Sequence, residues 1–149
     1  MNSKAITTSD GSLTMKLEDQ EENFHGSIGA RRESKELYIK GSGFDQYIRA
    51  QPSCNVLDIG LGLGYNALST IESWQKALNP CKLDMISLEI KPELVKQLRS
   101  GHAPWQANWD SNWINVCQNL KDSEQKNTSQ LKLQHPSNNA QLNLSLIHI

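Results

Sequence analysis

The chain has 149 residues and a formal net charge of −1, and 37% of its residues are hydrophobic, which suits a single globular domain. No run approaches the ~18 apolar residues of a membrane span, and the first residues lack the apolar core of a signal peptide. A cytoplasmic protein without membrane contact is therefore expected. The three cysteines and four histidines show neither paired nor ligand-like spacing, which argues against a disulfide framework and predicts no metal site.

The first fifty residues divide into two segments. Residues 1–12 are polar and contain an Asp10-Gly11 turn, which predicts a disordered tail. Residues 13–50 are interpreted as an N-terminal strap that precedes the core. Within the strap, the patterns predict short strands over 13–17 and 36–40, a hinge or turn over 41–43 and a brief helix over 44–48.

The stretch 56–66 is the most informative part of the chain. A short apolar run ends near Asp58, and three glycines then follow at alternate positions, namely Gly60, Gly62 and Gly64. This D-x-G-x-G-x-G spacing is typical of the strand–loop–helix turn by which many α/β enzymes hold an adenosyl cofactor. Glycine suits such a turn because the backbone must come close to the ligand without an intervening Cβ.

The flanking periodicity predicts a βαβα order. The apolar run over 55–59 predicts a buried strand, and apolar residues then recur at helical spacing until Asn79-Pro80. That helical face consists of Ala67, Leu68, Ile71, Trp74 and Leu78. A second apolar strand covers 83–89, and Pro92 begins another helix. The order predicts an α/β fold with a parallel, doubly wound sheet and a ligand at the carboxyl ends of its strands.

Two acidic residues favour one class of cofactor over another. A dinucleotide fingerprint has its third glycine one residue later than Gly64, and Asp58 would repel a pyrophosphate. A carboxylate there suits S-adenosylmethionine, which carries an amino group and a positive sulfonium. Glu89, near the tip of the second strand, is placed to accept hydrogen bonds from ribose hydroxyls. A nucleotide-dependent oxidoreductase of Rossmann type and a glycine-rich turn without a ligand remain as alternatives.

Two later patterns complete the chain. Trp105, Trp109 and Trp113 recur every four residues, which predicts one helical face with three indoles. That face either packs on a neighbouring element or offers a stacking surface for a nucleobase. Apolar runs over 131–133 and 142–144 flank a Pro-Ser-Asn-Asn turn and predict a hairpin, with a third strand of the sheet beginning near residue 141.

Several blocks of the chain together carry a resemblance to one enzyme family. Residues 22–30 resemble that family's N-terminal strap, and residues 33–44 match its E-[ST]-x-x-[VL]-[YF]-[IL] segment with the glycines after it. Residues 58–68 match G-x-G-x-G-x-N-x-L, including Asn66, and residues 85–92 match I-S-[FL]-E-x-x-P. Over about residues 13–143 the chain resembles the MnmC-like family of tRNA (5-methylaminomethyl-2-thiouridine) methyltransferases.

The resemblance implies an S-adenosylmethionine-dependent methyltransferase with a Rossmann-like fold. Its substrate would be the aminomethyl nitrogen of a modified wobble uridine in tRNA. The residues expected to bind the cofactor are Asp58, Gly60, Gly62, Gly64, Asn66 and Glu89. Three polar strap residues are expected to fold over the cofactor or to face the substrate amine, and these are His25, Ser27 and Glu33.

The chain departs from the family pattern towards its end. The family's third strand ends in Gly-Asp, whose acid holds the adenine, and a later Asp-Gly-Phe-Ala-Pro-like block is associated with the substrate amine; neither is present. Residues 144–149 resemble a translated sequencing adapter and are expected to be an artificial scar outside the fold. Residues 51–143 are therefore interpreted as the N-terminal half of a methyltransferase domain. Its sheet is expected to be incomplete at the C-terminus, and the fragment alone, with no assigned catalytic residue, is expected to be inactive.

Overall fold

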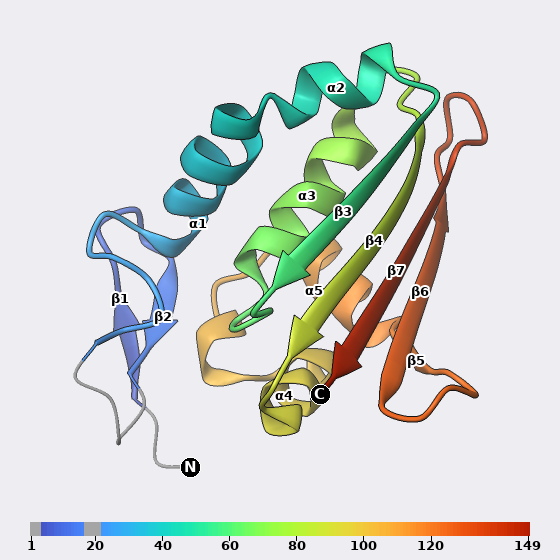
Figure 1. Ribbon diagram of the computed structural model, residues 1–149. Helices are drawn as coiled ribbons and strands as arrows, with labels where there is room; N and C mark the ends of the chain where they lie inside the picture. Colours follow the sequence, from blue (N-terminus) through green and yellow to red (C-terminus); the bar gives the residue numbers. More distant parts are fainter. Residues whose placement is uncertain (1–3, 17–21) are drawn as a thin grey trace.

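A five-stranded mixed β-sheet backed by helices forms the centre of the molecule (Figure 1). The computed structural model describes residues 4–16 and 22–149. Three strands run parallel in the order β3, β4 and β7, and their bounds are Ser53–Ile59, Lys82–Glu89 and Gln141–His148. Two antiparallel strands follow β7, namely β6 (Thr128–Gln134) and the short β5 (Lys121–Asp122). The predicted α/β class is confirmed.

Alternating apolar residues orient the central strands. Because successive strand residues point to opposite faces, Leu83 and Met85 of β4 and Leu142 of β7 reach the same face, where all three are buried. The predicted hairpin is confirmed, since Leu131 of β6 lies opposite Leu144 of β7. The predicted strands over 55–59 and 83–89 are also confirmed.

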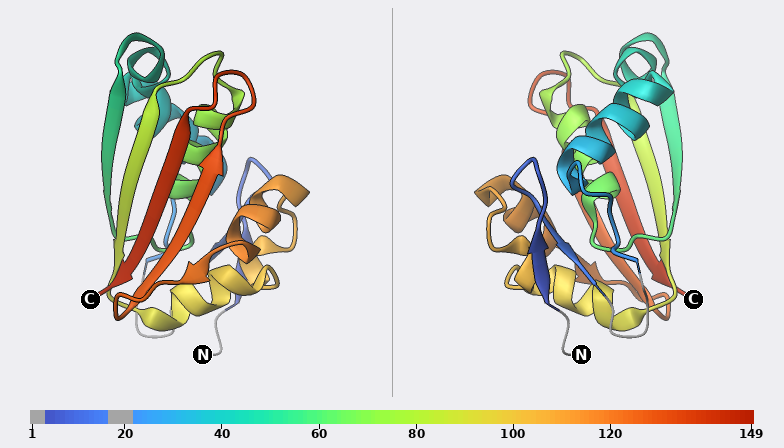
Figure 2. Two further views of the ribbon diagram at one scale, coloured as in Figure 1. Left: turned by 90° about the vertical axis from the view of Figure 1, so that its right-hand side faces the viewer. Right: turned by 90° about the vertical axis from the view of Figure 1, so that its left-hand side faces the viewer.

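Three helices pack on the same face of the sheet (Figure 2). They are α3 (Tyr65–Lys76), α4 (Pro92–Ser100) and α5 (Ser111–Gln118). The helices expected after the glycines and at Pro92 are therefore confirmed. α3 ends at Lys76, so Leu78 lies beyond it and is 74% exposed, contrary to its expected place on the helical face. No helix in the described part of the chain is long and apolar enough to cross a membrane.

The amino-terminal segment contains a β-hairpin instead of the expected disordered tail. β1 (Ala5–Thr7) pairs antiparallel with β2 (Leu13–Met15). The expectation for residues 1–12 is wrong over residues 4–12, because Asp10 stabilises the turn between these strands. Its Oδ1 accepts hydrogen bonds from Thr8 Oγ1 and from the backbone N–H of Ser12, both at 2.9 Å. The expected strand over 13–17 is confirmed for 13–15, while residues 1–3 and 17 lie outside the described residues.

The second half of the strap is helical. α1 (Ala30–Glu33) continues into a π-helix, η1 (Ser34–Lys40), and α2 (Phe44–Ala50) follows after Gly43, which has a φ of 70°. The predicted strand over 36–40 is wrong. A π-turn places residues five apart on one face, and Ser34 and Ile39 are both buried by this arrangement. The turn at 41–43 and the helix over 44–48 are confirmed at Gly43 and in α2.

The three tryptophans do not share one helix. Trp105 belongs to a 3₁₀ turn, η2 (Pro104–Gln106), Trp109 lies in the connection, and Trp113 is in α5. The predicted single helical face is wrong because Asp110 caps a new helix by accepting the Trp113 N–H at 3.0 Å. The indoles of Trp109 and Trp113 nevertheless pack together, with their ring centroids 5.2 Å apart. Trp105 and Trp113 are each 1% exposed, so these two indoles pack in the core and offer no stacking surface.

The last residues belong to the sheet. Residues 144–148 lie in β7 between β4 and β6, and Leu144 and Leu146 are buried. The expectation that residues 144–149 lie outside the fold is therefore wrong in this structure. The physical reason is that Leu142, Leu144 and Leu146 continue one period-2 apolar pattern, so pairing with both neighbours buries them all on the helix side.

The opposite face of the sheet is open at its β3 side. Leu57 and Ile59 of β3 and Ile86 of β4 are 60%, 78% and 44% exposed. A doubly wound sheet carries helices on both faces, whereas α3, α4 and α5 all lie on one. One face of the sheet is therefore covered by helices, whereas the other face exposes apolar side chains of β3 and β4.

Candidate cofactor site

The glycine-rich loop joins the carboxyl end of β3 to the first turn of α3. The N–H groups of Gly60 and Leu61 donate to the carbonyl oxygen of Leu88 at 3.0 and 2.9 Å, so the loop begins against the end of β4. Its three glycines have φ angles of 84°, 56° and 91° at Gly60, Gly62 and Gly64. The loop thus lies at the carboxyl ends of two parallel strands, where open α/β sheets bind ligands.

Side chains would be strained at the last two glycines. A Cβ at Gly64 would lie 2.9 Å from Cδ1 of Leu98 on α4, and a Cβ at Gly62 would lie 3.4 Å from Cδ1 of Phe24 in the strap. Both φ angles are also in the left-handed region, which L-residues rarely adopt. The shape of the loop therefore depends on glycine, and the strap lies directly against it.

Glu89 lies at the end of β4 with its carboxylate turned towards the loop. Oε2 accepts the N–H of Gly62 at 2.7 Å, and Oε1 accepts the N–H of Lys91 at 2.9 Å. Glu89 is only 6% exposed. Each carboxylate oxygen has a further lone pair, so hydroxyl donors of a ligand could still be accepted. Glu89 therefore holds the loop in place, a role that the sequence did not indicate. Its binding of ribose hydroxyls stays a prediction.

Asp58 lies beside this carboxylate, one residue before the end of β3. Ser87 Oγ donates to its Oδ2 at 2.5 Å. Burial raises the pKa of Asp58, and the neighbouring charge of Glu89 raises the pKa further, while the hydrogen bond from Ser87 opposes the rise. Two carboxylates at adjacent strand ends favour a bound cation, because a positive charge would relieve their repulsion.

Asn66 connects the loop region to the strap. The Oγ–H of Ser34, at the start of η1, donates to Asn66 Oδ1 at 2.7 Å, and Ser34 is fully buried. With Oδ1 engaged in this way, the Nδ2 group of Asn66 is oriented as a donor. Asn66 lines a cavity of about 540 Å³ together with Asp58 and Tyr38. The structure therefore brings Asn66 and Asp58 to one cavity.

Tyr65, directly after the third glycine, anchors the strap. Its hydroxyl donates to the carbonyl oxygen of Leu13 in β2 at 2.8 Å and accepts the indole N–H of Trp109 at 3.1 Å. Its ring lies edge-to-face with His25 at 5.1 Å. Tyr65 is 1% exposed. The sequence did not indicate this role of Tyr65, because its partners come from distant segments.

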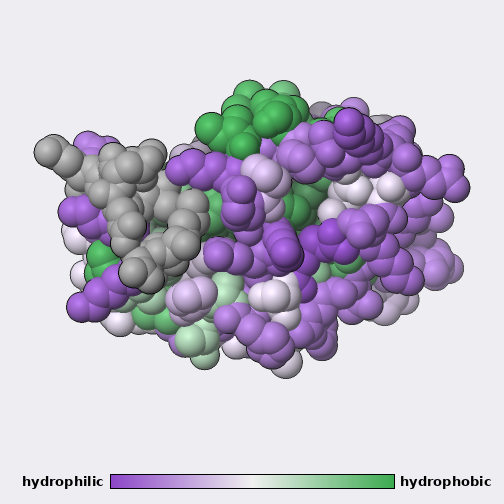
Figure 3. All heavy atoms as spheres, turned by 90° about the horizontal axis from the view of Figure 1, so that it is seen from below, coloured by the Kyte–Doolittle hydropathy of each residue, from purple (hydrophilic) through white to green (hydrophobic). Residues whose placement is uncertain are grey.

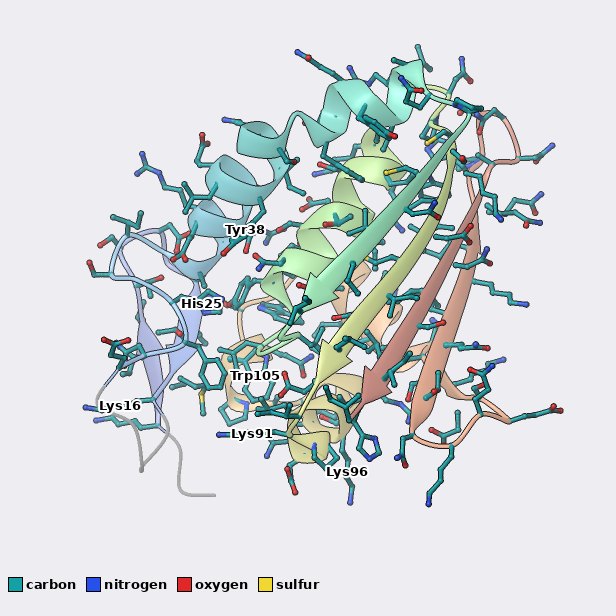
Figure 4. All side chains as sticks on the ribbon, viewed as in Figure 1. Lys16, His25, Tyr38, Lys91, Lys96 and Trp105 are labelled. Atoms are coloured by element: carbon teal, nitrogen blue, oxygen red, sulfur yellow. The ribbon has the colours of Figure 1, made fainter. Side chains whose placement is uncertain are left out.

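The structure brings one of the three expected strap residues next to the loop. Figure 4 shows His25 between the β1–β2 hairpin and the end of β3, with Trp105 below it. Nδ1 of His25 lies 3.2 Å from Thr14 Oγ1, and burial lowers its pKa although Glu33 and Asp10 oppose that shift. Burial therefore favours the neutral form of the His25 imidazole.

Ser27 and Glu33 make contacts within the strap. The carbonyl oxygen of Ser27 accepts hydrogen bonds from the backbone N–H and the Oγ of Ser9 at 3.0 and 2.8 Å. Glu33 Oε2 accepts the N–H of Gly26 at 3.1 Å. These contacts stabilise the segment that carries His25 and Phe24. Their expected role at the cofactor or the amine stays a prediction.

The loop end of the molecule is mostly hydrophilic, with an apolar area at one margin (Figure 3). Within residues 4–16 and 22–149, no group of three or more His, Cys, Asp or Glu side chains is arranged to hold a metal ion. The three cysteines are buried, and burial raises the pKa of Cys117 to about 12. The polar side chains described around the loop are two carboxylates, an amide and an imidazole, which belong to Glu89, Asp58, Asn66 and His25.

Comparisons with known proteins support one family. No protein-family model matches the chain. It is 28% identical over 97 residues to the tRNA 5-methylaminomethyl-2-thiouridine biosynthesis bifunctional protein MnmC of Azoarcus sp., a match that covers 58% of the chain and 15% of that relative. The protein of the same name from Polaromonas naphthalenivorans is 32% identical over 72 residues, which cover 48% of the chain and 11% of that relative. An uncharacterized protein of Methanocaldococcus jannaschii is 31% identical over 83 residues, or 56% of the chain and 21% of that relative.

A solved structure agrees with these relatives. The crystal structure of MnmC2 from Aquifex aeolicus matches with a TM-score of 0.56 and 26% identity. The match covers 60% of the chain and 30% of the solved chain. The chain thus spans only a minor part of the length of the curated relatives and of the solved protein that it resembles. Sequence and fold agree on the same family.

Proposed function

Because the chain is MnmC-like in sequence and fold, we propose that it is the cofactor-binding part of an S-adenosylmethionine-dependent tRNA methyltransferase. One observation carries the proposal: the Gly60–Gly64 loop closes on the carboxylate of Glu89, with the carboxylate of Asp58 beside it. A glycine-rich loop whose two leucine side chains are buried, next to two carboxylates, suits a ligand that combines ribose hydroxyls with positive charge. The relatives are named for tRNA modification, and on this basis a cytoplasmic location is part of the proposal.

The residues fit the cofactor in distinct roles. The carboxylate of Glu89 would accept the ribose hydroxyls, and Asp58 would face the positively charged end of the ligand. Gly60, Gly62 and Gly64 would let the backbone approach the ligand, and Asn66 would donate from Nδ2. When bound, the cofactor would supply a methyl group on a sulfonium sulfur, for in-line transfer from that sulfur to a neutral amine. The protein's contribution is then mainly to position the two reactants.

The acceptor is proposed to be the aminomethyl nitrogen of a modified wobble uridine. His25, whose pKa is lowered by burial and whose ring packs against Tyr65, would face this amine from the strap side. Three lysines, Lys16, Lys91 and Lys96, lie along the same lower end of the molecule in Figure 4 and are suitable for tRNA phosphates. We assign no proton acceptor among the described residues.

Calorimetry on the 149-residue chain tests the cofactor assignment. We expect S-adenosylhomocysteine to bind and NADH to give no heat. Gly62→Val should abolish binding, because a β-branched side chain at a φ of 56° would distort the loop and press on Phe24. The matched control is Glu93→Gln, an exposed change on α4 that should leave affinity unchanged. Binding of NADH, or equal affinity for Gly62→Val and the parent chain, would refute the assignment.

A further inference from the structure

One part of the strap, residues 22–33, lies against the glycine-rich loop. Phe24 approaches Gly62 so closely that a Cβ there would lie 3.4 Å from the phenyl ring. The ring of His25 lies edge-to-face with Tyr65, the residue directly after the loop, and Figure 4 shows His25 between the β1–β2 hairpin and the end of β3. A ligand that reaches the loop at Gly62 therefore has to pack against Phe24 or move it.

Arg31 connects this segment to the body of the molecule. Its guanidinium donates to Asp110 Oδ2 at 2.8 Å and to Glu72 Oε2 at 3.5 Å, and its Cζ lies 4.2 Å from the ring centroid of Trp113. In the described part of the chain, no other hydrogen bond joins this segment to residues 41–149. The hydrogen-bonded attachment of the segment to α3 and α5 therefore depends on one side chain.

Apolar contacts would hold the segment only weakly. Among its three apolar residues, Ala30 is buried, Phe24 is partly buried and Ile28 is 56% exposed. Apolar burial is the main force that holds segments of a protein together, so little of that force opposes detachment here. The Arg31 side chain, in contrast, is only 29% exposed, which partly shields its ion pairs from water. The contacts of Arg31 are therefore the main attachment of the segment.

We propose that residues 22–33 are a lid over the glycine-rich loop and that Arg31 is the positioning residue that keeps this lid closed. The fixed end of the lid is Ser34, which donates to Asn66. Between the lid and this fixed end the helix changes from α1 to the π-helix η1, and helices bend most readily at such discontinuities. A bound S-adenosyl ligand enters and leaves through the open state. The ligand rests on the proposed function, whereas the attachment of the lid does not.

The substitution Arg31→Ala is suited to test the lid because it should leave the helices folded. Glu72 keeps its ion pairs with Lys35, at 3.7 Å, and with Lys76. Asp110 keeps its role as the N-cap of α5. No carboxylate is left buried without a partner, so the variant changes the attachment of the lid and not the fold beneath it.

Binding kinetics of tritiated S-adenosylhomocysteine with the 149-residue chain test the lid. Because a lid obstructs entry and exit alike, Arg31→Ala should raise both the association and the dissociation rate constants about fivefold or more, and change the dissociation constant by less than about threefold. Arg32→Ala, at an exposed neighbour in α1, is the matched control and should change neither rate constant. Unchanged rate constants in Arg31→Ala, or a rise in the dissociation rate constant alone, would overturn the proposal.

A distance measurement by electron paramagnetic resonance tests the lid without a ligand. Nitroxide labels at Ile28→Cys in the lid and Asn115→Cys in α5 are attached at exposed positions, while the three native cysteines are buried. We expect Arg31→Ala to add a population at longer distance. Raising NaCl from about 0.1 M to about 1 M should do the same in the chain that keeps Arg31, because screening weakens its ion pairs.

The two experiments separate the lid from the proposed function. If S-adenosylhomocysteine does not bind the parent chain, the proposed function fails, and the distance measurement still decides on the lid. A distance distribution that neither Arg31→Ala nor added salt alters would overturn the lid, whatever the ligand.

Discussion

The two sides of β3 are packed very differently. On the helix side Cys54 is 6% exposed, and the strand rests on a layer that buries Trp74, Trp105 and Trp113 almost completely. On the outer side, Leu57 and Ile59 are more exposed than buried, and the edge of β3 has no strand partner among residues 4–16 and 22–149. The same strand therefore combines a buried side that supports the glycine-rich loop with a side whose apolar residues are exposed.

The largest expected effect is on the packed side. Trp105→Ala should lower the free energy of unfolding by about 3–5 kcal/mol, because it leaves a cavity and removes the indole N–H that donates to the carbonyl of Leu63 at 3.0 Å. Ile59 is 78% exposed, so Ile59→Ser should change the free energy of unfolding by about 0.5 kcal/mol or less. Urea unfolding measures both. Similar losses for the two variants would show that the outer side is covered in solution.

The next effect is on ligand binding at the end of β4. Glu89→Ala should weaken binding of S-adenosylhomocysteine by about 1.5–3 kcal/mol, because hydrogen bonds to a charged group are lost, including the one that holds Gly62. Calorimetry measures the change. Lys91→Ala is the control, since it keeps the backbone N–H that Glu89 accepts. An unchanged affinity in Glu89→Ala would remove Glu89 from the site.

A smaller effect is expected where the strap meets the loop region. Ser34→Ala removes a buried hydrogen bond to Asn66 and should cost about 1 kcal/mol of unfolding free energy. A double-mutant cycle with Asn66→Ala should give a coupling energy of similar size, measured by urea unfolding. If the two substitutions are additive, the contact between η1 and α3 does not stabilise the fold.

The smallest effect is expected at the turn of the β1–β2 hairpin. Burial raises the pKa of Asp10, but hydrogen bonds from Ser12, Arg32 N–H and Thr8 outweigh it and hold the pKa at about 2, below the ordinary 3.8. Because the pKa of Asp10 is lower in the folded state than in the unfolded state, its ionised carboxylate stabilises the fold above about pH 4. This contribution is lost as the pH falls towards 2. The difference in melting temperature between the parent chain and Asp10→Asn should shrink over that range. Glu124→Gln, exposed after β5, is the control, and a constant difference for Asp10→Asn would contradict the assignment.

Local sequence patterns were sufficient for the elements with strong periodicity. β3, α3, β4, α4 and the β6–β7 hairpin follow from apolar spacing, because each buries one face against a large neighbour. The glycines of the loop follow from their alternate positions. The prediction of a strand over 36–40 was wrong because its short apolar run fits a strand and a helix equally well. Burial of Ile39 and Ser34 against the helix layer favours η1.

The sequence by itself therefore determined the α/β class, the glycine-rich loop and the two carboxylates at the strand ends. Only the tertiary structure showed that Glu89 accepts the N–H of Gly62, that Tyr65 joins His25 to Leu13, and that Ser34 orients Asn66. These contacts join segments that are far apart along the chain, and no local spacing encodes them. The position of β3 at the edge of the described sheet was also visible only in the tertiary structure, because strand order depends on pairing between distant segments and not on the pattern within any one strand.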